Sequence, residues 1–254
     1  MFITSTSSPK RLLGSHLASF FSGNRRIARA MTPKHVHEAN VFGVYRKVGT
    51  MLMSHPRVTQ VVDIGAGRQW HFPPYYKDWY RIHLIGLDID RNEMTGNDVL
   101  DEKIDGDVVD HVPFAPGSID LFMVHSGIEH FSDTERAMRN LFAALRPGGF
   151  LLAEFPNRFA HFAIMNRLFP PALSHWLLDN FLGTSAESLG VKTYYNNTSY
   201  SKFKNVCKNV GFKQLYFVPG YYGSFYFEFF VPLYVFSYAF DMVGYAMGVK
   251  SLAS

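Results

Sequence analysis

The stretch Val58–Gly67, with the sequence VTQVVDIGAG, decides the fold. It begins as a short apolar run that ends at Gly65, which is typical of a buried parallel strand. Two glycines one residue apart then allow the backbone to turn tightly and to approach a ligand closely. In a sheet built with crossover helices, such a loop lies at the carboxyl end of the first strand, where ligands bind.

Further strand and helix signals alternate along the chain. The apolar runs Leu84–Ile89, Ile119–Val124 and Phe150–Phe155 each predict a buried strand. Between the last two, Asp133–Leu145 has the pattern of a helix, with acids near its start and Arg146 after its last turn. Strands separated by helices favour a parallel sheet wrapped by crossover connections.

Segments on either side of this pattern complete the expected domain. Apolar residues at helical spacing over Glu38–His55 predict a helix that covers the sheet. Arg68–Arg81 is expected to be partly irregular because Pro73-Pro74 interrupts it. Near the other end, Tyr200–Gly211 reads as a helix and Phe212–Val218 as a further strand.

Composition excludes several classes of protein. The chain has 254 residues, of which 47% are apolar, so it can bury a core and is not disordered overall. A single cysteine, Cys207, excludes a disulfide framework and a cysteine-based zinc site. No spacing of His, Asp and Glu predicts a metal site. The net charge of +4 gives no reason to expect a nucleic-acid partner.

Residues 1–37 form a basic N-terminal segment without any Asp or Glu. One interpretation is a basic N-terminus that leads into a surface helix. The alternative is a transit peptide that directs the protein to an organelle. The basic residues of this segment are Lys10, Arg11, Arg25, Arg26, Arg29 and Lys34.

Acidic residues follow the predicted strands in a fixed order. Asp88 comes at the end of the second strand, where a carboxylate can accept hydrogen bonds from both hydroxyls of a ribose. A dinucleotide site would require a glycine where Trp70 stands. Two further motifs contain acids, Asp105-Gly106-Asp107 and Glu129-His130-Phe131. They are followed by a turn motif without an acid, Leu145-Arg146-Pro147-Gly148-Gly149.

This ordered set resembles the class I S-adenosylmethionine-dependent methyltransferases, firmly over residues 58–157 and loosely over Tyr200–Val218. The resemblance implies a Rossmann-like, doubly wound, mostly parallel α/β sheet with helices on both faces. It also implies an enzyme that uses S-adenosyl-L-methionine. One departure is Gln69, which stands where the family often has a third glycine.

The resemblance also implies roles for the residues of the first two strands. Asp63, Gly65 and Gly67 match the loop that holds the amino-acid part of the cofactor. Asp88 matches the acid that binds its ribose. Without the resemblance, the two glycines could mark only a tight turn, and Asp88 could be a helix cap.

Later motifs supply the rest of the implied cofactor site. Asp107 and Val108 match the position that meets the adenine ring, although Asp107 could instead be a turn residue. His125 and Ser126 fall just past the fourth family strand, where the methionine end of the cofactor and the acceptor meet.

Three residues are candidates for a catalytic base, namely His125, Glu129 and His130. A base helps if the acceptor is a hydroxyl or an activated carbon, and none is needed if the acceptor is a neutral amine. The alternative for His130 is a packing or capping role.

The expected domain, residues 38–220, carries an insert at 158–197 that the resemblance identifies as a lid over the acceptor. An aromatic extension, residues 221–254, follows it. The extension could complete the fold as a strand and a packed helix, lie in a membrane interface, or line a pocket for a lipophilic acceptor.

Together these features predict a methyltransferase that acts on a small acceptor, lipophilic or presented by a membrane, with oxygen as the first choice of accepting atom. The alternative is a non-catalytic module of the same fold that docks a membrane or a protein. The expected location is the cytoplasm, with peripheral attachment to a membrane or targeting to an organelle as variants. The oligomeric state stays open.

Overall fold

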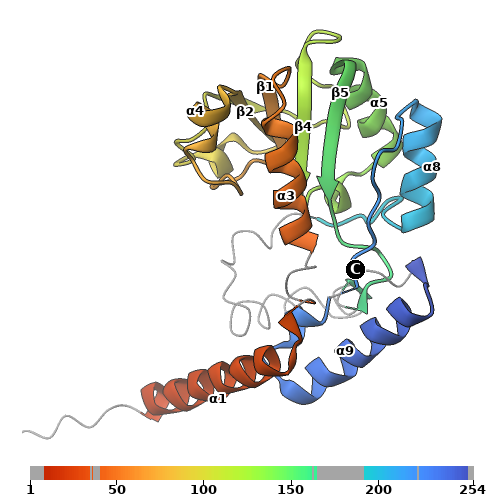
Figure 1. Ribbon diagram of the computed structural model, residues 1–254. Coiled ribbons are helices and arrows are strands. Elements are labelled where there is room, and N and C mark those ends of the chain that lie inside the picture. Colours follow the sequence, from red (N-terminus) through yellow and green to blue (C-terminus); the bar gives the residue numbers. More distant parts are fainter. Residues whose placement is uncertain are drawn as a thin grey trace, which may run out of the picture.

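A computed structural model describes residues 9–34, 36, 41–161, 163–164, 192–221 and 223–250, with the backbone alone for residues 9–18. Its centre is a five-stranded sheet in the order β3-β2-β1-β4-β5, in which all neighbouring strands are parallel (Figure 1). The strands are β1 (Gln60–Ile64), β2 (His83–Asp88), β3 (Glu102–Asp105), β4 (Ile119–His125) and β5 (Leu145–Glu154).

Alternate residues of the inner strands point to opposite faces of the sheet, and both faces are covered. Val62, Ile85 and Phe122 belong to one buried cluster, together with side chains of α5 (Thr134–Ala144) and α8 (Tyr200–Val210). Val61 and Leu84 belong to a second cluster, which includes side chains of α3 (Val41–Met53) and packs against α4 (Tyr76–Tyr80). This arrangement confirms the expected Rossmann-like sheet with helices on both faces.

Asp120 has a structural role at the start of the sheet. Its carboxylate accepts the backbone N–H groups of Thr59 and Gln60 at 2.7 and 2.9 Å and the Thr59 hydroxyl at 3.0 Å. Arg146 lies 2.9 Å from its other oxygen. The buried acid therefore joins the entry to β1 with β4 and β5, because it satisfies donors from each side.

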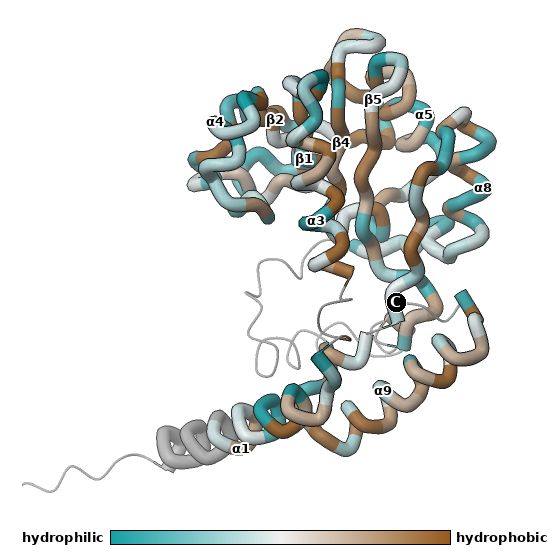
Figure 2. Tube along the Cα trace, in the orientation of Figure 1, coloured by the Kyte–Doolittle hydropathy of each residue, from teal (hydrophilic) through white to brown (hydrophobic). Residues whose placement is uncertain are grey.

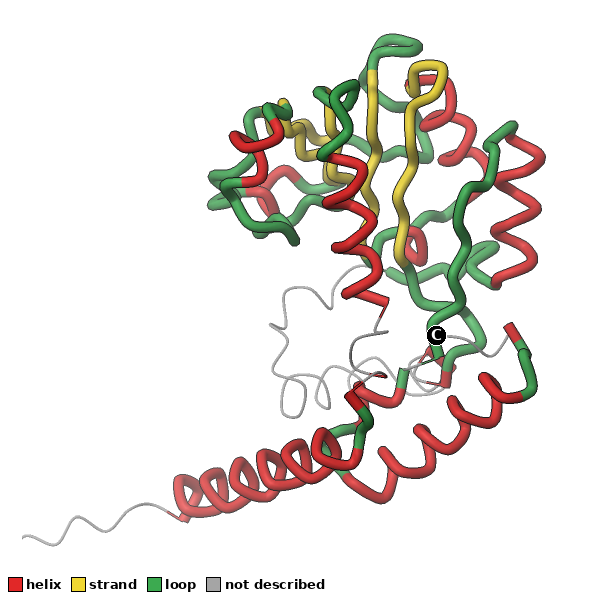
Figure 3. The backbone as a smooth tube through the Cα atoms, viewed as in Figure 1, coloured by secondary structure: helices red, strands yellow, loops and turns green. Residues whose placement is uncertain are grey.

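Two sequence-based expectations about strands differ from the structure. Phe212–Val218 is a loop, not a strand (Figure 3). Phe212 and Phe217 pack onto the core while Leu215 stays exposed, and no strand lies beside the segment in the described sheet. Strand β3 was not anticipated, since Glu102–Asp105 is a partly exposed edge with little apolar signal.

Two boundaries differ by several residues, and one further expectation is confirmed. β5 begins at Leu145 and not at Phe150, with a register shift opposite Ile119–Leu121. The expected irregularity of Arg68–Arg81 is confirmed, because only Tyr76–Tyr80 is helical there. The helix expected over Glu38–His55 is observed from Val41 to Met53, and residues 38–40 lie outside the described residues.

Two helices from opposite ends of the chain pack together beside the sheet domain (Figures 1 and 2). These are α1 (Pro9–Met31) and α9 (Val231–Ala246), preceded by the short 3₁₀ helix η5 (Ser224–Phe227). Arg29 lies 2.8 Å from Glu228, and Asn24 accepts the Val231 N–H at 2.9 Å. Of the final strand and packed helix expected in the aromatic extension, the described residues contain the helix only.

None of the helices in the described residues has the combination of length and apolarity needed for a membrane crossing.

Gly86 of β2 lies directly beneath the glycine loop, and a Cβ there would come within 2.5 Å of Leu100 and 3.0 Å of Ala66. We expect Gly86→Ala to destabilise the fold by about 1–3 kcal/mol, since overpacking forces neighbours to shift. Urea unfolding measures the effect. Gly23→Ala is the control, because the space beside this helical glycine is open and alanine favours helix. Equal stability of the two variants would contradict the close packing.

Candidate functional site

The glycine loop turns away from β1 at the carboxyl edge of the sheet. Gly65 and Gly67 have φ angles of +69° and +48°, a region that favours glycine. The Gly65 N–H donates to the Leu87 carbonyl at 2.8 Å, and the Gly67 N–H donates to the Asp88 carboxylate at 3.0 Å. The loop is therefore attached to the end of β2 by its own backbone.

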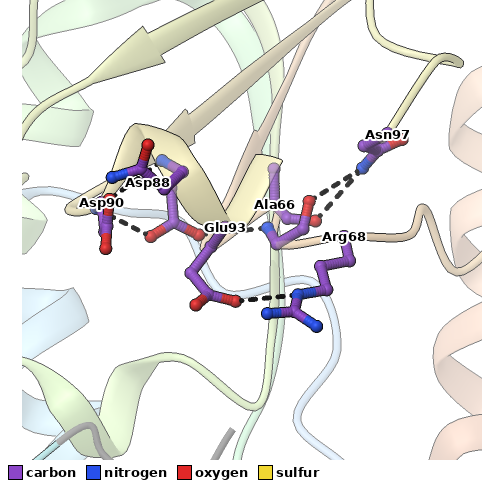
Figure 4. Close-up of polar contacts among 8 residues, drawn as sticks. Ala66, Arg68, Asp88, Asp90, Glu93 and Asn97 are labelled. Carbon is purple, nitrogen blue, oxygen red and sulfur yellow. Dashed lines mark hydrogen bonds and ion pairs between the residues drawn. The ribbon is translucent and has the colours of Figure 1, made fainter. Parts of the chain in front are cut away.

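Two side chains that the sequence did not indicate hold the same loop (Figure 4). Asn97 is buried, and its amide donates to the carbonyls of Ala66 and Gly67 at 3.3 and 3.1 Å. Arg68 lies 3.4 Å from Glu93. A lone asparagine in a loop carries no sequence signal for this role, because only folding brings it beneath the glycines.

Asp88 is not the helix cap that the sequence left open. Its second oxygen accepts the Asp90 N–H at 3.2 Å, and Asp90 itself caps the short helix η1 (Arg91–Met94) by accepting from Asn92. Each carboxylate oxygen of Asp88 accepts one N–H and so keeps a further lone pair for a ligand hydroxyl.

Asp63 is a buried acid near the start of the loop. One of its oxygens, Oδ2, has no hydrogen-bond partner among the described residues. Burial, and secondarily the negative charge of Asp88, raise the pKa of Asp63 to about 7. A buried carboxyl without a cation beside it is a ready partner for a positively charged ligand group.

Asp107 makes the turn that the sequence allowed as an alternative. Its Oδ1 accepts the Val109 N–H at 2.8 Å, two residues on, as in an Asx turn. Val108 is buried beside it in the core. The turn bond uses one oxygen atom of Asp107, and it holds the segment that follows β3.

A compact group of polar side chains gathers at the ends of β4 and β5. His125 and Glu154 are paired in the strand register, and His125 Nε2 lies 3.8 Å from Glu154 Oε2. Ser126 has a φ of +50°, and its hydroxyl donates to Glu154 at 3.2 Å. His125 stacks on His71 with ring centroids 3.9 Å apart. Sequence reasoning missed Glu154, although an acid at the end of the apolar run FLLAEF was a usable signal.

Burial sets the protonation of this group. It lowers the pKa of His125 to about 4, helped by the charges of His71 and Arg46. It raises the pKa of Glu154 to about 7 against the opposing hydrogen bonds from Ser126. At neutral pH the imidazole is therefore uncharged, and Glu154 is poised between its two forms.

Glu129 and His130, the other candidate bases, lie on the short helix η2 (Ile128–His130). Burial raises the pKa of Glu129 to about 8 and lowers that of His130. His130 Nδ1 lies 3.1 Å from the Lys192 carbonyl, and the Glu129 carbonyl accepts the N–H groups of Tyr194 and Tyr195. The backbone and ring contacts of this helix tie it to residues 192–195, which fits the packing alternative for His130.

Two hollows open near His125. A cleft of about 950 Å³ is lined by His125 and by parts of α3, Arg68–Pro74 and Gly96–Val99. A smaller cavity of about 170 Å³ lies between α3, the end of β5 and the loop Tyr216–Gly220, with Glu154 in its wall. Of the expected cofactor residues, only His125 lines the cleft, and none lines the cavity.

Residues 62–153 match the family model of the methyltransferase domain. The match covers 92 of the 254 residues, so the chain contains a methyltransferase domain. Comparison with curated proteins found no match.

Solved methyltransferases share the arrangement at low identity. A SAM-dependent methyltransferase from Archaeoglobus fulgidus is 15% identical, with 70% of this chain and 72% of that one covered and a TM-score of 0.48. One from Thermotoga maritima is 16% identical, with coverages of 72% and 82% and a TM-score of 0.44. Phosphoethanolamine N-methyltransferase 2 from Haemonchus contortus is 14% identical, with coverages of 80% and 49% and a TM-score of 0.48. At these values none of them bears on what this protein modifies.

The residues present fit S-adenosylmethionine. The cofactor carries a cationic amino group and a ribose, which require an acid and a hydroxyl acceptor. The unpartnered oxygen of Asp63 and the remaining lone pairs of Asp88 offer both at one edge of the sheet. Nothing lies within 4 Å of where a Cβ of Gly65 would be, so the loop leaves room for a ligand.

Parts of the expected site fall outside the described residues. Of the lid expected over 158–197, residues 162 and 165–191 are not described, and these include the polar and aromatic residues Asn166, Arg167, His175 and Trp176. Within the described part of the chain, no group of three or more His, Cys, Asp or Glu side chains is arranged to hold a metal ion.

Buried acids make the stability of this protein depend on pH. The pKa values of Asp63, Glu154 and Asp241 are raised to about 7 and that of Glu129 to about 8. Between pH 6.5 and 8 the folded state therefore binds more protons than the unfolded chain, and stability falls as pH rises. Each group contributes at most about 1.4 kcal/mol per pH unit.

Urea unfolding across this pH range measures the slope. Histidines with lowered pKa oppose the trend only near and below pH 6.5, their ordinary value. Glu129→Gln is expected to reduce the slope, and Glu135→Gln, at an exposed ion pair with Arg139, is expected to leave it unchanged. A stability that rises from pH 6.5 to 8 would contradict the burial of the acids.

Proposed function

We propose that this chain is a class I S-adenosylmethionine-dependent methyltransferase, and that it transfers a methyl group to the oxygen of a small lipophilic acceptor. The observation that carries the proposal is the cavity of about 170 Å³ beside Glu154. Val41, Val44 and Val48 of α3 line one side of it, and Phe217 lines another. An acceptor with an apolar body and one hydroxyl would suit this wall, because a small number of polar groups among apolar ones fixes the orientation of a ligand.

The size of the cavity supports a small acceptor. Apolar cavities of about 150 Å³ in proteins hold one benzene molecule. A single ring or a short branched chain therefore fits the space at Glu154. In this proposal Asn157, which also lines the cavity, is a second polar contact.

We also propose the cofactor roles that the family resemblance implies. In this scheme Asp63 pairs with the amino group, Gly65 and Gly67 pass close to the amino-acid part, and Asp88 accepts the ribose hydroxyls. Asp107 and Val108 meet the adenine, and His125 and Ser126 flank the methionine end. The buried, unpartnered oxygen of Asp63 and the open space beside Gly65 support the first two roles.

S-Adenosylmethionine supplies a methyl group on a sulfonium that leaves as a neutral thioether. As the new O–CH₃ bond forms, the acceptor hydroxyl must lose its proton. Glu154 is the proposed proton acceptor, since a base is most effective when its pKa lies near the working pH. Ser126 orients the carboxylate through its hydrogen bond.

In this proposal, His125, Glu129 and His130, the three bases expected from the sequence, do not accept the proton of the acceptor. Neutral His125, held by stacking on His71, flanks the methionine end of the cofactor and excludes water. Glu129 has the higher pKa and stays largely protonated at neutral pH, so it is a poor base. His130 faces the Lys192 carbonyl and serves in packing.

Removal of the Asp88 carboxylate tests the cofactor site. We expect Asp88→Ala to weaken S-adenosylmethionine binding at least about 100-fold, since hydrogen bonds to a charged group contribute about 1.5–3 kcal/mol each. Isothermal titration calorimetry measures the affinity, and circular dichroism checks the fold. Asp90→Ala removes a neighbouring carboxylate that only caps η1, and it is expected to bind normally. Wild-type affinity of Asp88→Ala would disprove the ribose role.

Methyl transfer itself is tested with labelled S-adenosylmethionine and fractionated cell extract. Label is expected in small, ether-extractable products, and the rate is expected to rise with pH through about 7. Glu154→Gln is expected to lose at least about 100-fold in rate together with this pH dependence. Glu135→Gln is the control. Label confined to protein or RNA fractions contradicts the acceptor proposal.

The second candidate is a non-catalytic module of the same fold. It is favoured only if the chain binds S-adenosylmethionine and transfers no label to any fraction. The expected alternative of a transit peptide at residues 1–37 stays a prediction.

A further inference from the structure

The outward side of α9 is apolar and exposed to solvent. Phe236, Phe240, Val243 and Met247 follow one another at helical spacing on this side, and Phe236 and Met247 are 71% and 70% exposed. The opposite side of the helix, including Tyr234, is buried. Figure 2 shows α9 as largely apolar along its length. Soluble proteins rarely leave such a continuous apolar stripe without a partner.

The neighbouring helix extends this surface. On α1, Phe20, Ile27 and Met31 are more than half exposed and lie at helical spacing. Because α1 packs along α9, the exposed residues of both helices belong to one two-helix unit (Figure 1). We call this set of seven exposed residues the apolar face.

The charges around the apolar face all have one sign. In the described residues 19–34 and 223–250 the only acids are Glu228 and Asp241, and they are 8% and 1% exposed. Exposed charge in this unit is therefore entirely positive. The exposed cations are Arg26, Lys34 and Lys250, together with Arg29, which is ion-paired with Glu228.

We propose that the apolar face docks on the surface of a membrane that contains anionic lipids. Apolar and aromatic side chains enter the boundary between headgroups and acyl chains, and the cations contact the lipid phosphates. The unit lies in the plane of the membrane, because neither helix combines the length and apolarity needed to cross it, and α9 with its 16 residues spans only about 24 Å. A hydrocarbon core is about 30 Å thick.

A second copy of this chain fits the same face less well. In a twofold dimer each patch meets its own copy, so the arginines and lysines of the two protomers would be brought close together. An anionic surface instead neutralises all of them. The complementarity of charge therefore selects the lipid surface as the occupant.

The position of the face relative to the sheet fits this proposal. The arrow of β5 points toward the side on which α1 and α9 lie (Figure 1). The carboxyl edge of the sheet, with His125 and Glu154, is thus on the side of the docking unit. Lys250, shortly after α9, also lines the cavity beside Glu154. A docked protein would hold this cavity near the membrane, although the docking itself does not depend on the proposed acceptor.

Sedimentation with vesicles tests the docking of the full chain. We expect binding to vesicles in which phosphatidylglycerol replaces part of the phosphatidylcholine, weak binding to pure phosphatidylcholine, and release at high salt. Phe236→Asp is expected to weaken binding at least tenfold, and Arg26→Glu at least about fivefold.

The matched control is Leu215→Asp, which places the same charge at an exposed apolar residue (67% exposed) outside the face. This variant is expected to bind vesicles like the wild type. Unchanged affinity for S-adenosylmethionine and an unchanged circular dichroism spectrum show that Phe236→Asp is folded, and both readouts are independent of the acceptor.

Three results overturn the proposal. The protein could remain in the supernatant with anionic vesicles at low salt. It could bind neutral and anionic vesicles equally, which removes the role of the cations. In sedimentation velocity it could form a dimer that Phe236→Asp abolishes, which assigns the face to a second copy.

Discussion

The attachment of the glycine loop to the end of β2 is the constraint on which the rest of the site depends. Hydrogen bonds from Gly65 to Leu87 and from Gly67 to Asp88 fix the path of the loop across the carboxyl edge. This path requires positive φ at both glycines and no side chain at Gly86 beneath them. Asp88 is consequently held by the loop that it is expected to serve, so its carboxylate is oriented before any ligand arrives.

Burial of several acids in a small volume gives this edge its chemical character. Asp63, Glu129 and Glu154 all have raised pKa values because low polarity disfavours their charged forms. Such groups lower the stability of the fold, and proteins retain them mostly where they act on a ligand. The acids lie at the ends of β1 and β5 and on η2, so the parallel arrangement of the strands brings them together.

Many of the aromatic residues of the chain lie outside the sheet domain, in the extension that contains η5 and α9. The extension neither adds a described strand to the sheet nor fills its core. Instead, α9 buries Tyr234 and Asp241 against α1 and the end of the domain, and leaves its other side apolar and exposed. The only charged residue of α9, Asp241, is buried, so the exposed side of the helix has no charged group for water to solvate.

The amino-acid sequence alone determined the parallel sheet, four of its strands, the glycine loop and the family, because periodicity and local turn chemistry are carried by neighbouring residues. It could not separate the loop Phe212–Val218 from a strand, since a short aromatic segment packs on the core in either conformation. Asn97 and His71 entered the site only through folding, because long-range packing brings them beside residues distant in the chain. Tertiary structure also decided which side of α9 is exposed. When a helix is apolar all round, its sequence does not show which side packs against the protein.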